Sequence, residues 1–409
     1  MQGYDTLFIG QPIFTQLLFY VKGSKIDTIA RKHNAERYVK KFSTRQHLII
    51  MLFSAFEGYN SLREVVLGML SNAHKLVHLG LDYMICRSTL SDANRRRSSA
   101  VFGEIYLSVY AKNHKSLSDS SLSPKDLKRL YAMDSTTISL FKEILKGGGR
   151  NPISGKKKGG IKAHTMIKIA EQMPCLVRFT EAARHDHVLL SEVHLSKNSI
   201  ITFDKAYVDY AAYERFSKAG VFYVTRLKDN ALYESGEEFD IPDEADSGVL
   251  KDEEIILKYG KNGEFKHCSR KIAYYDAQNK RLFEFITNNF DLAAEKIALI
   301  YKKRWQIELL FKQLKQNFQL KYFLGDSQNA IEIQIWCAML ANLLLMLVKS
   351  RVTKSWAFSN LVSVVRRQLM NYINIYAFLE DAERSWRKII EERTKKQFLE
   401  PSLFANFRL

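Results

Sequence analysis

A series of short apolar runs beginning at Leu130 restricts the fold of this chain most strongly. These runs are rich in β-branched and aromatic residues, as β-strands are, and they cover residues 130–140, 158–170, 175–183, 199–207 and 221–227. Residues 188–193 and 210–217, between the later runs, have the spacing of helices. The first three runs would form a meander. We therefore expect a mixed α/β domain built on one sheet.

The order of these elements is three strands, a helix, a strand, a helix and a strand, which is the order of a ribonuclease H-like fold. Residues 228–285 start with an acidic stretch and continue with strand-like segments, which indicates a β-rich insertion. Before Leu130 the spacing is helical, with Ser43 and Ser61 as candidate N-caps, up to a serine-rich polar linker. The predicted domains are an all-α N-terminal domain, an α/β domain and a helical C-terminal region, at residues 1–120, 126–345 and 346–409.

Two of the strand-like runs contain an isolated acid. Asp134 lies in LYAMDSTTI, and Asp204 ends the apolar part of IITFDKAY. A carboxylate in an apolar strand is costly unless it is paired, and a divalent metal ion would stabilise it. The alternative for Asp134 is a strand-end aspartate that is hydrogen-bonded to the hydroxyls of Ser135 and Thr136.

The segment YKKRWQIELLFKQLK, residues 301–315, contains good helix formers and neither glycine nor proline, so we expect one uninterrupted helix. At about 100° per residue, one face carries a phenol, two cations and a carboxylate, namely Tyr301, Arg304, Glu308 and Lys315. A separate apolar stripe is expected to be buried, and it consists of Ile307, Leu310 and Leu314. The alternative is a solvated amphipathic helix in which Glu308 pairs with Arg304 or Lys312.

The spacing Tyr-x2-Arg-x3-Glu-x6-Lys resembles the signature of DDE transposases of the cut-and-paste insertion-sequence type. The resemblance implies that Asp134, Asp204 and Glu308 are the catalytic residues and that they bind two Mg²⁺ or Mn²⁺ ions per site. It also implies DNA contacts by the remaining members of the signature, which are Tyr301, Arg304 and Lys315.

Two details of the family pattern stay open at this stage. The motif after Asp204 usually has the form Asp-x-Gly/Ala-x-x-Tyr, and Ala206 fits the small position, but tyrosines stand at 207 and 210 and do not align uniquely. Trp305 could stack on DNA or pack in the core. Some relatives hold a flipped base with an aromatic residue in the strand before the helix, where this chain offers Phe283 or Phe285.

The function that the resemblance implies is that of a DNA transposase. Such an enzyme binds the terminal inverted repeats of its insertion sequence, cleaves the strands and transfers them to target DNA in a cut-and-paste reaction. Because two ends of one element must be held together, a homodimer on paired ends is expected. Two other interpretations remain, a structure-specific DNA nuclease of the same fold and an inactive DNA-binding derivative.

The charge of the chain favours nucleic acid as the partner. The formal net charge is +18 and the pI is about 9.5, so the protein attracts polyanions; a ribosome-associated or merely basic protein is the alternative. Residues 87–97 have the pattern of a helix with a basic end, in which Ser, Asn and Arg side chains would face DNA, with Arg95 and Arg96 as DNA-binding candidates. An ordinary exposed helix is equally compatible. The glycine- and lysine-rich residues 146–160 are a further candidate for contact with the DNA backbone.

The expected cellular location rests on three features that the sequence lacks: a C-x-x-C pair, a signal-peptide pattern and a membrane span. The four cysteines are far apart and form no C-x-x-C pair, so reduced thiols are expected. The N-terminus lacks a signal-peptide pattern. The longest apolar stretch, residues 335–348, contains Asn342 and is shorter than a membrane span. We therefore expect a cytoplasmic, nucleoid-associated bacterial protein.

Overall fold

The computed structural model describes residues 10–22, 24–81, 83–118, 127–139, 160–181, 186–241, 247–260 and 263–399. The chain forms two compact units, which are described separately. Unit 1 comprises Met1–Ser116, Asn317–Gly325 and Asn329–Leu409, and unit 2 comprises Leu117–Gln316 and Asp326–Gln328. The serine-rich linker was expected to start after Ala111, but the chain is helical up to Leu117, and residues 119–126 of this linker lie outside the described residues. Residues 146–159 of the glycine- and lysine-rich segment also lie outside them.

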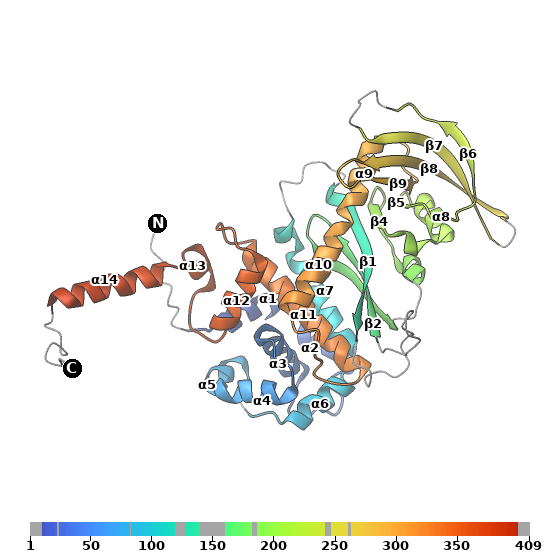
Figure 1. Ribbon diagram of the computed structural model, residues 1–409. Helices are drawn as coiled ribbons and strands as arrows, with labels where there is room; N and C mark the ends of the chain where they lie inside the picture. Colours follow the sequence, from blue (N-terminus) through green and yellow to red (C-terminus); the bar gives the residue numbers. More distant parts are fainter. Residues whose placement is uncertain are drawn as a thin grey trace. The chain divides into compact units, whose positions relative to one another are not determined.

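Unit 1 is built from helices (Figure 1). They are α1 (Ile13–Lys22), α2 (Ile26–Lys32), α3 (Thr44–Glu57), α4 (Leu62–Ser71), α5 (Ala73–Leu76), η1 (Val77–Leu79), α6 (Arg87–Arg96), α7 (Ser99–Leu117), α11 (Gln328–Lys349), α12 (Phe358–Gln368), α13 (Ile375–Glu380) and α14 (Arg384–Leu399). The predicted N-caps are confirmed, because the hydroxyls of Ser43 and Ser61 accept hydrogen bonds from the backbone N–H groups of Gln46 and Glu64.

Helix α11 corrects the expectation that the chain contains no segment long and apolar enough to cross a membrane. Gln328–Lys349 has a mean hydropathy of 2.0 in its most apolar window, and 89% of that window is buried inside the protein. The side chains of α11 pack instead against other helices of unit 1. Trp336 of α11 lies against Tyr106 of α7, with 5.6 Å between ring centroids. Such burial is typical of a core helix.

Unit 2 is organised around one nine-stranded sheet with the strand order β3-β2-β1-β4-β5-β9-β8-β7-β6. Its strands are β1 (Leu130–Ser139), β2 (Gly160–Lys168), β3 (Met173–Glu181), β4 (Ile200–Phe203), β5 (Phe222–Arg226), β6 (Tyr233–Glu238), β7 (Val249–Tyr259), β8 (Phe265–Asp276) and β9 (Arg281–Thr287). The mixed α/β class and the five predicted strands are thereby confirmed.

The strands and helices of unit 2 alternate as expected, with one correction. β1, β2 and β3 form the predicted antiparallel meander. On the other side of β1, β4 pairs with it in parallel, and β5 pairs in parallel with β4. Helix α8 (Tyr210–Lys218) occupies its predicted place. The segment predicted as an α-helix at residues 188–193 is a 3-10 helix, η3 (Asp186–Glu192). Two further 3-10 turns precede β1 and follow β4, η2 (Leu127–Arg129) and η4 (Lys205–Tyr207).

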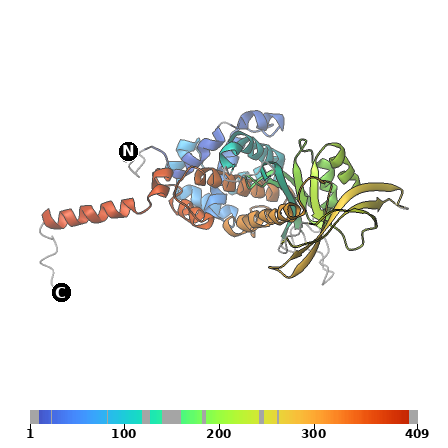
Figure 2. The same cartoon turned by 90° about the horizontal axis from the view of Figure 1, so that it is seen from above.

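The predicted β-rich insertion extends the main sheet. β9 pairs antiparallel with β5, and β8, β7 and β6 follow outward from it. Figure 2 shows these yellow strands beside the green strands of the first half of unit 2. The chain therefore returns along β9, next to β5, before it enters α9 (Ala294–Lys303) and α10 (Trp305–Asn317).

We predict that Gly103→Ala lowers the melting temperature of the protein. A Cβ atom at this buried position of α7 would lie 2.8 Å from the ring of Trp336. The resulting overpacking costs about 1–3 kcal/mol, whereas alanine gains only about 1 kcal/mol over glycine in helix propensity. Thermal unfolding of Gly103→Ala, Trp336→Phe and the double variant tests this. The double variant should lose less stability than the sum of the single losses, and simple additivity would contradict the predicted contact.

Candidate active site

Two of the predicted acids come together through the parallel pairing of β1 and β4. Met133 of β1 is in register with Phe203 of β4, and each of these residues directly precedes an acid. Asp134 and Asp204 therefore follow at equivalent positions of neighbouring strands. Asp134 continues within β1, where it faces Thr165 of β2, whereas Asp204 leaves β4 and begins the turn η4.

Glu308 reaches the site from a separate helix. The expected single helix over residues 301–315 is wrong in one respect, because α9 ends at Lys303 and α10 begins at Trp305. At this junction the N–H of Arg304 donates to the carbonyl of Tyr301, and the N–H of Ile307 donates to that of Arg304. These bonds span three residues, so the helix tightens locally. The predicted apolar stripe is confirmed, since Ile307, Leu310 and Leu314 are buried.

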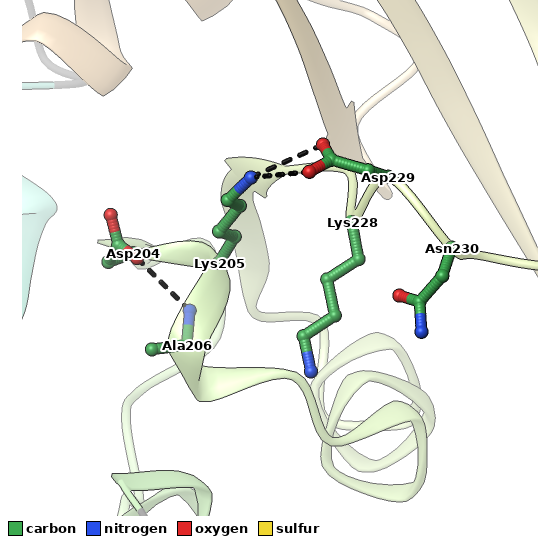
Figure 3. A pocket seen from close by; sticks show the side chains of 6 residues that line it. All are labelled: Asp204, Lys205, Ala206, Lys228, Asp229 and Asn230. Atoms are coloured by element: carbon green, nitrogen blue, oxygen red, sulfur yellow. Dashed lines mark hydrogen bonds and ion pairs between the residues drawn. The ribbon is translucent and has the colours of Figure 1, made fainter. Parts of the chain in front are cut away.

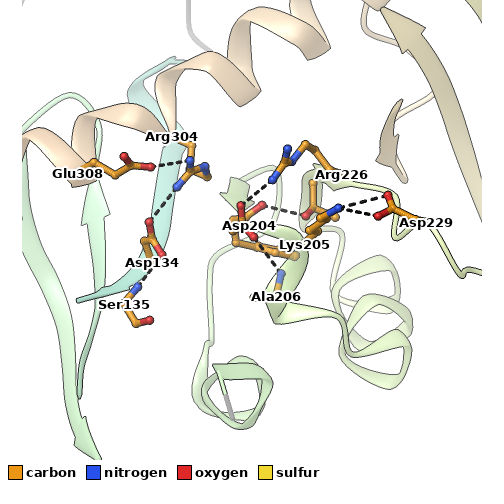
Figure 4. Close-up of polar contacts among 11 residues, drawn as sticks. Asp134, Ser135, Asp204, Lys205, Ala206, Arg226, Asp229, Arg304 and Glu308 are labelled. Atoms are coloured by element: carbon orange, nitrogen blue, oxygen red, sulfur yellow. Dashed lines mark hydrogen bonds and ion pairs between the residues drawn. The ribbon is translucent and has the colours of Figure 1, made fainter. Parts of the chain in front are cut away.

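Arg304 lies between two of the three acids (Figure 4). Its Nη1 donates to Oδ2 of Asp134 over 2.8 Å, and its Nη2 donates to Oε1 of Glu308 over 2.7 Å. The pair that the alternative interpretation expected between Glu308 and Arg304 is thus present, but Arg304 also binds Asp134. The other oxygen of Asp134 accepts from the backbone N–H of Ser135 over 2.7 Å. One guanidinium therefore connects β1 with α10.

The third acid is bound by an arginine that the sequence analysis did not single out. Nη2 of Arg226 donates to Oδ2 of Asp204 over 3.1 Å, and the N–H of Ala206 donates to Oδ1. Arg226 is the last residue of β5, which pairs in parallel with β4. Its position at the end of the fifth predicted strand was the available signal, because the carboxyl ends of parallel neighbours meet at one edge of a sheet.

Tyr301 lies between the two arginines. The guanidinium carbons of Arg226 and Arg304 are 5.8 Å and 5.7 Å from the centre of its ring. The Tyr301 hydroxyl and the Nε atoms of both arginines are buried and lack a hydrogen bond of normal geometry to any described residue. Burial raises the pKa of Tyr301, against the opposing effect of Arg304 and Arg226. Donors without partners in a cationic setting suit an anionic ligand.

The carboxylates influence one another electrostatically. The pKa of Asp134 is raised to about 6, chiefly by burial; the charges of Glu308 and Asp204 add to this rise, while the Ser135 N–H and Arg304 oppose it. Among the described residues, no three His, Cys, Asp or Glu side chains lie in an arrangement that could hold a metal ion as the side chains now stand. The carboxylates are instead hydrogen-bonded to Arg226 and Arg304. The donor set of three neighbouring carboxylates nevertheless fits Mg²⁺ or Mn²⁺, which prefer hard oxygen ligands.

Lys315, the last member of the signature, lies on the Glu308 side of the site. Its ammonium group donates to Oγ1 of Thr136 over 2.6 Å, and burial lowers its pKa. An open pocket of about 490 Å³ lies there, lined by Asp134, Ser135, Thr136, Glu308, Phe311, Lys312, Lys315 and Gln316. The pocket places two lysines beside two of the acids.

The aromatic candidates differ in exposure. Trp305 is 56% exposed, which excludes the core-packing alternative in this structure. Phe285 is buried with its ring centre 4.9 Å from that of Tyr301, and Phe283 stacks on Phe285 at 5.7 Å. Phe285 therefore packs against the ring of Tyr301.

A buried ion pair in the insertion holds the segment that leads into α9. Nε of Arg270, in β8, donates to Oδ1 of Asp252, in β7, over 2.8 Å, and Nη2 donates to Oδ2 over 2.5 Å. Nη1 of Arg270 donates to the carbonyl of Leu292 over 2.6 Å and to those of Asn289 and Phe290 over 3.3 Å. The insertion thus holds the backbone just before α9, the helix that leads to Arg304 and then to α10 with Glu308.

The DNA-binding candidates of unit 1 lie on α6. Arg95 and Arg96 are exposed, and Arg95 pairs with Asp92 over 3.1 Å. Asn94 was expected to face DNA, but this is wrong. It is buried, and its side-chain oxygen is 2.7 Å from Nε2 of His47. Arg97 is also buried, where it donates to the carbonyls of Ala35 and Phe42.

Comparison with known proteins identifies the family. Residues 125–344 match the family described as Transposase DDE domain, and residues 9–82 match a domain of unknown function (DUF4372). A Sinorhizobium fredii protein named as a transposase, y4zB, is 29% identical over 258 residues, which are 63% of this chain and 69% of that protein. A Geobacillus stearothermophilus protein named as the transposase of insertion sequence element IS5377 is 28% identical over 246 residues, or 59% and 62% of the two chains.

Two further similarities were found. A Synechocystis protein named as the transposase of insertion sequence element IS4SA is 26% identical over 271 residues, 64% of this chain and 71% of that protein. A cryo-EM structure of a piggyBac transposase synaptic complex with hairpin DNA has 11% identity and a TM-score of 0.43, over 97% of this chain and 85% of that chain. These last values are too low to support a conclusion. Because the Transposase DDE domain match spans more than half of the chain and contains all three acids and both arginines, this chain belongs to that family and is a transposase of the insertion-sequence type.

Proposed function

We propose that this transposase binds the terminal inverted repeats of its own insertion sequence and moves the element by cut-and-paste. It would belong to the branch with the Tyr-x2-Arg-x3-Glu-x6-Lys signature, and unit 2 would be a ribonuclease H-like domain. The observation that carries the proposal is the meeting of three carboxylates from β1, the end of β4 and α10, where Glu308 and Asp204 both raise the pKa of Asp134. Repulsion of this kind is what bound cations relieve.

In this proposal Asp134, Asp204 and Glu308 bind two divalent ions, Mg²⁺ or Mn²⁺. Such ions activate a water or 3′-hydroxyl nucleophile and stabilise the leaving oxygen in phosphodiester chemistry. The residues of the chain position the DNA. Tyr301, Arg226 and Arg304 have buried polar atoms that lack a hydrogen bond of normal geometry to any described residue, and these atoms would donate to a phosphate of the transposon end and orient it.

The arginines would have a second role. Arg304 holds Asp134 and Glu308, and Arg226 holds Asp204, so each of the three carboxylates is ion-paired in the free protein. A DNA phosphate competes for the same guanidinium groups. When Arg304 and Arg226 turn toward the phosphate, the carboxylates become free to bind cations. Binding of the end and completion of the site would then occur together.

Unit 1 would recognise the ends through α6, with Arg95 and Arg96 on its exposed surface. The domain limits proposed for these roles are residues 1–120 for end binding, 126–345 for catalysis and 346–409 for the C-terminal region. Two ends must be joined in one complex, so the active form would be a homodimer on paired ends. Action on chromosomal DNA would place the protein in the bacterial cytoplasm, at the nucleoid.

We predict that Glu308→Gln abolishes end cleavage while binding of end DNA is retained. The substitution keeps the shape of the side chain but removes a charge needed for cation binding. Cleavage of a labelled duplex from the element's end, in Mg²⁺, measures the first property, and a gel-shift assay measures the second. Asp134→Asn and Asp204→Asn should behave in the same way. Substantial cleavage by Glu308→Gln would contradict the assignment.

A contrast between neighbouring arginines tests the role of α6. Arg95→Ala and Arg96→Ala should weaken binding of end DNA, and each lost phosphate contact should reduce the slope of the salt dependence by about one. Because both side chains are exposed, the melting temperature should change little. Arg97→Ala should instead lower the melting temperature, since two carbonyls lose a buried donor. Unchanged end binding in both surface variants would place recognition elsewhere.

Tyr301→Phe should separate function from stability. The hydroxyl lacks a hydrogen bond of normal geometry to the described residues, so its removal should leave the free energy of unfolding unchanged or raise it by about 1 kcal/mol. If the hydroxyl bonds a DNA phosphate, end cleavage should fall about tenfold, as expected for one hydrogen bond to a charged group. Denaturant unfolding and cleavage rates provide the two readouts. A destabilised variant with normal cleavage would refute this role.

A further inference from the structure

A second pocket lies next to Asp204, on the side away from Glu308. It has a volume of about 570 Å³ and is lined by Asp204, Lys205, Ala206, Lys228, Asp229 and Asn230 (Figure 3). The lining comes from the turn after β4 and the loop after β5. Of these residues, Asp204 alone has a part in the proposed cleavage chemistry. The pocket therefore contains cationic groups that the reaction has not yet used.

The two lysines of this pocket differ in their partners. Lys205 is held by Asp229, with both carboxylate oxygens 3.2 Å from its ammonium group. Asp229 is 91% exposed, so this pair is solvated and weak. The Lys228 side chain extends away from that pair, and its ammonium group forms no ion pair or hydrogen bond with another described residue. One cation is free and the other is easily released.

The position of the pocket matches the geometry of phosphoryl transfer. In an in-line displacement, the attacking and leaving oxygens lie on opposite sides of the phosphorus atom. Figure 4 shows Asp134 and Glu308 on one side of Asp204, and Lys205 with Asp229 on the other. The pocket with Lys312 and Lys315 lies on the Glu308 side, and we assign that side to the transposon end. The pocket with Lys228, on the opposite side of Asp204, is then available to the second DNA of the reaction.

We propose that this second pocket binds the phosphodiester backbone of target DNA during strand transfer, an inference that rests on the proposed function. Lys228 contacts a target phosphate directly, and Lys205 contacts a neighbouring phosphate after it leaves Asp229. The 3′-hydroxyl of the transposon end loses its proton to water and forms a bond to the target phosphorus. The bond from that phosphorus to the target 3′-oxygen breaks, and the leaving oxygen is protonated by water.

Effective concentration, rather than charge, favours target DNA over the donor DNA that flanks the element as the ligand that depends on this pocket. Both present the same phosphates, and lysine contacts to phosphate carry no sequence information. Flanking DNA is covalently joined to the end and is already held at a high effective concentration. Target DNA arrives from solution, so its binding depends on local cations. Removal of such a cation should therefore affect target capture more than end cleavage.

The test uses the full-length protein with transposon ends that already carry a free 3′-hydroxyl, and a plasmid as target. In Lys228→Ala, the plasmid concentration for half-maximal strand transfer should rise about five- to tenfold, the effect of one lost phosphate contact. The ratio of strand transfer to cleavage of uncut ends should fall by a similar factor at low plasmid concentration. Lys228→Gln, which retains the length of the side chain without the charge, should give the same result.

Asp229→Asn provides a change in the opposite direction. Without the carboxylate, Lys205 is released, so strand transfer should require less plasmid than in the wild type. Lys218→Ala is the matched control, because Lys218 is an exposed lysine of α8 that pairs with a carboxylate, Glu214 over 3.2 Å, and lines neither pocket. Its strand transfer should equal that of the wild type.

Two results would overturn the proposal. An equal loss of cleavage and transfer in the Lys228 variants would mean that the pocket serves flanking DNA or the fold. An unchanged dependence on plasmid concentration would mean that it binds no target. The proposed function fails in a different way, since the wild-type protein itself would then neither cleave ends nor join them to plasmid DNA.

Discussion

The bridge that Arg304 forms between Asp134 and Glu308 is the interaction on which the geometry of the candidate site depends. It joins a central strand to a helix that lies 170 positions later in the chain, and both carboxylates are mostly withdrawn from water. Buried carboxylates need a cation, and here a side chain supplies it. Arg226 does the same for Asp204. Each acid of the site is therefore ion-paired with an arginine, which stabilises the cluster of acids in the free protein.

The acids of this site could be predicted from the sequence because isolated charges in apolar strands are rare and expensive. Asp134 and Asp204 each end or interrupt such a run, and the parallel register then places them together. The signal for Arg226 was weaker, since an arginine at a strand end is common, and the pairing of β4 with β5 is needed to show what it faces. Similarly, helical spacing placed Asn94 on α6 but could not show that its side chain is buried and hydrogen-bonded to His47.

Sequence signals were weaker for the arrangement of the larger parts of the fold, namely the β-rich insertion and helix α11. Strand-like segments indicated an insertion after β5, but their spacing cannot show that β9 joins the edge of the main sheet or that Arg270 holds the entry to α9. The apolar stretch at residues 335–348 was clear from the sequence, yet an apolar surface does not specify the partner against which it packs. Gly103 makes room for Trp336, and this close approach of α7 and α11 depends on tertiary packing.

The central claim is that Asp134, Asp204 and Glu308 act as one cation-binding set. The most direct measurement is Mn²⁺ binding, followed by electron paramagnetic resonance, for the protein in complex with a duplex from the element's end. The account predicts that the wild-type complex binds Mn²⁺ and that each of Asp134→Asn, Asp204→Asn and Glu308→Gln weakens this binding severely. Retention of wild-type Mn²⁺ affinity by any one of the three variants, with end DNA still bound, would contradict it.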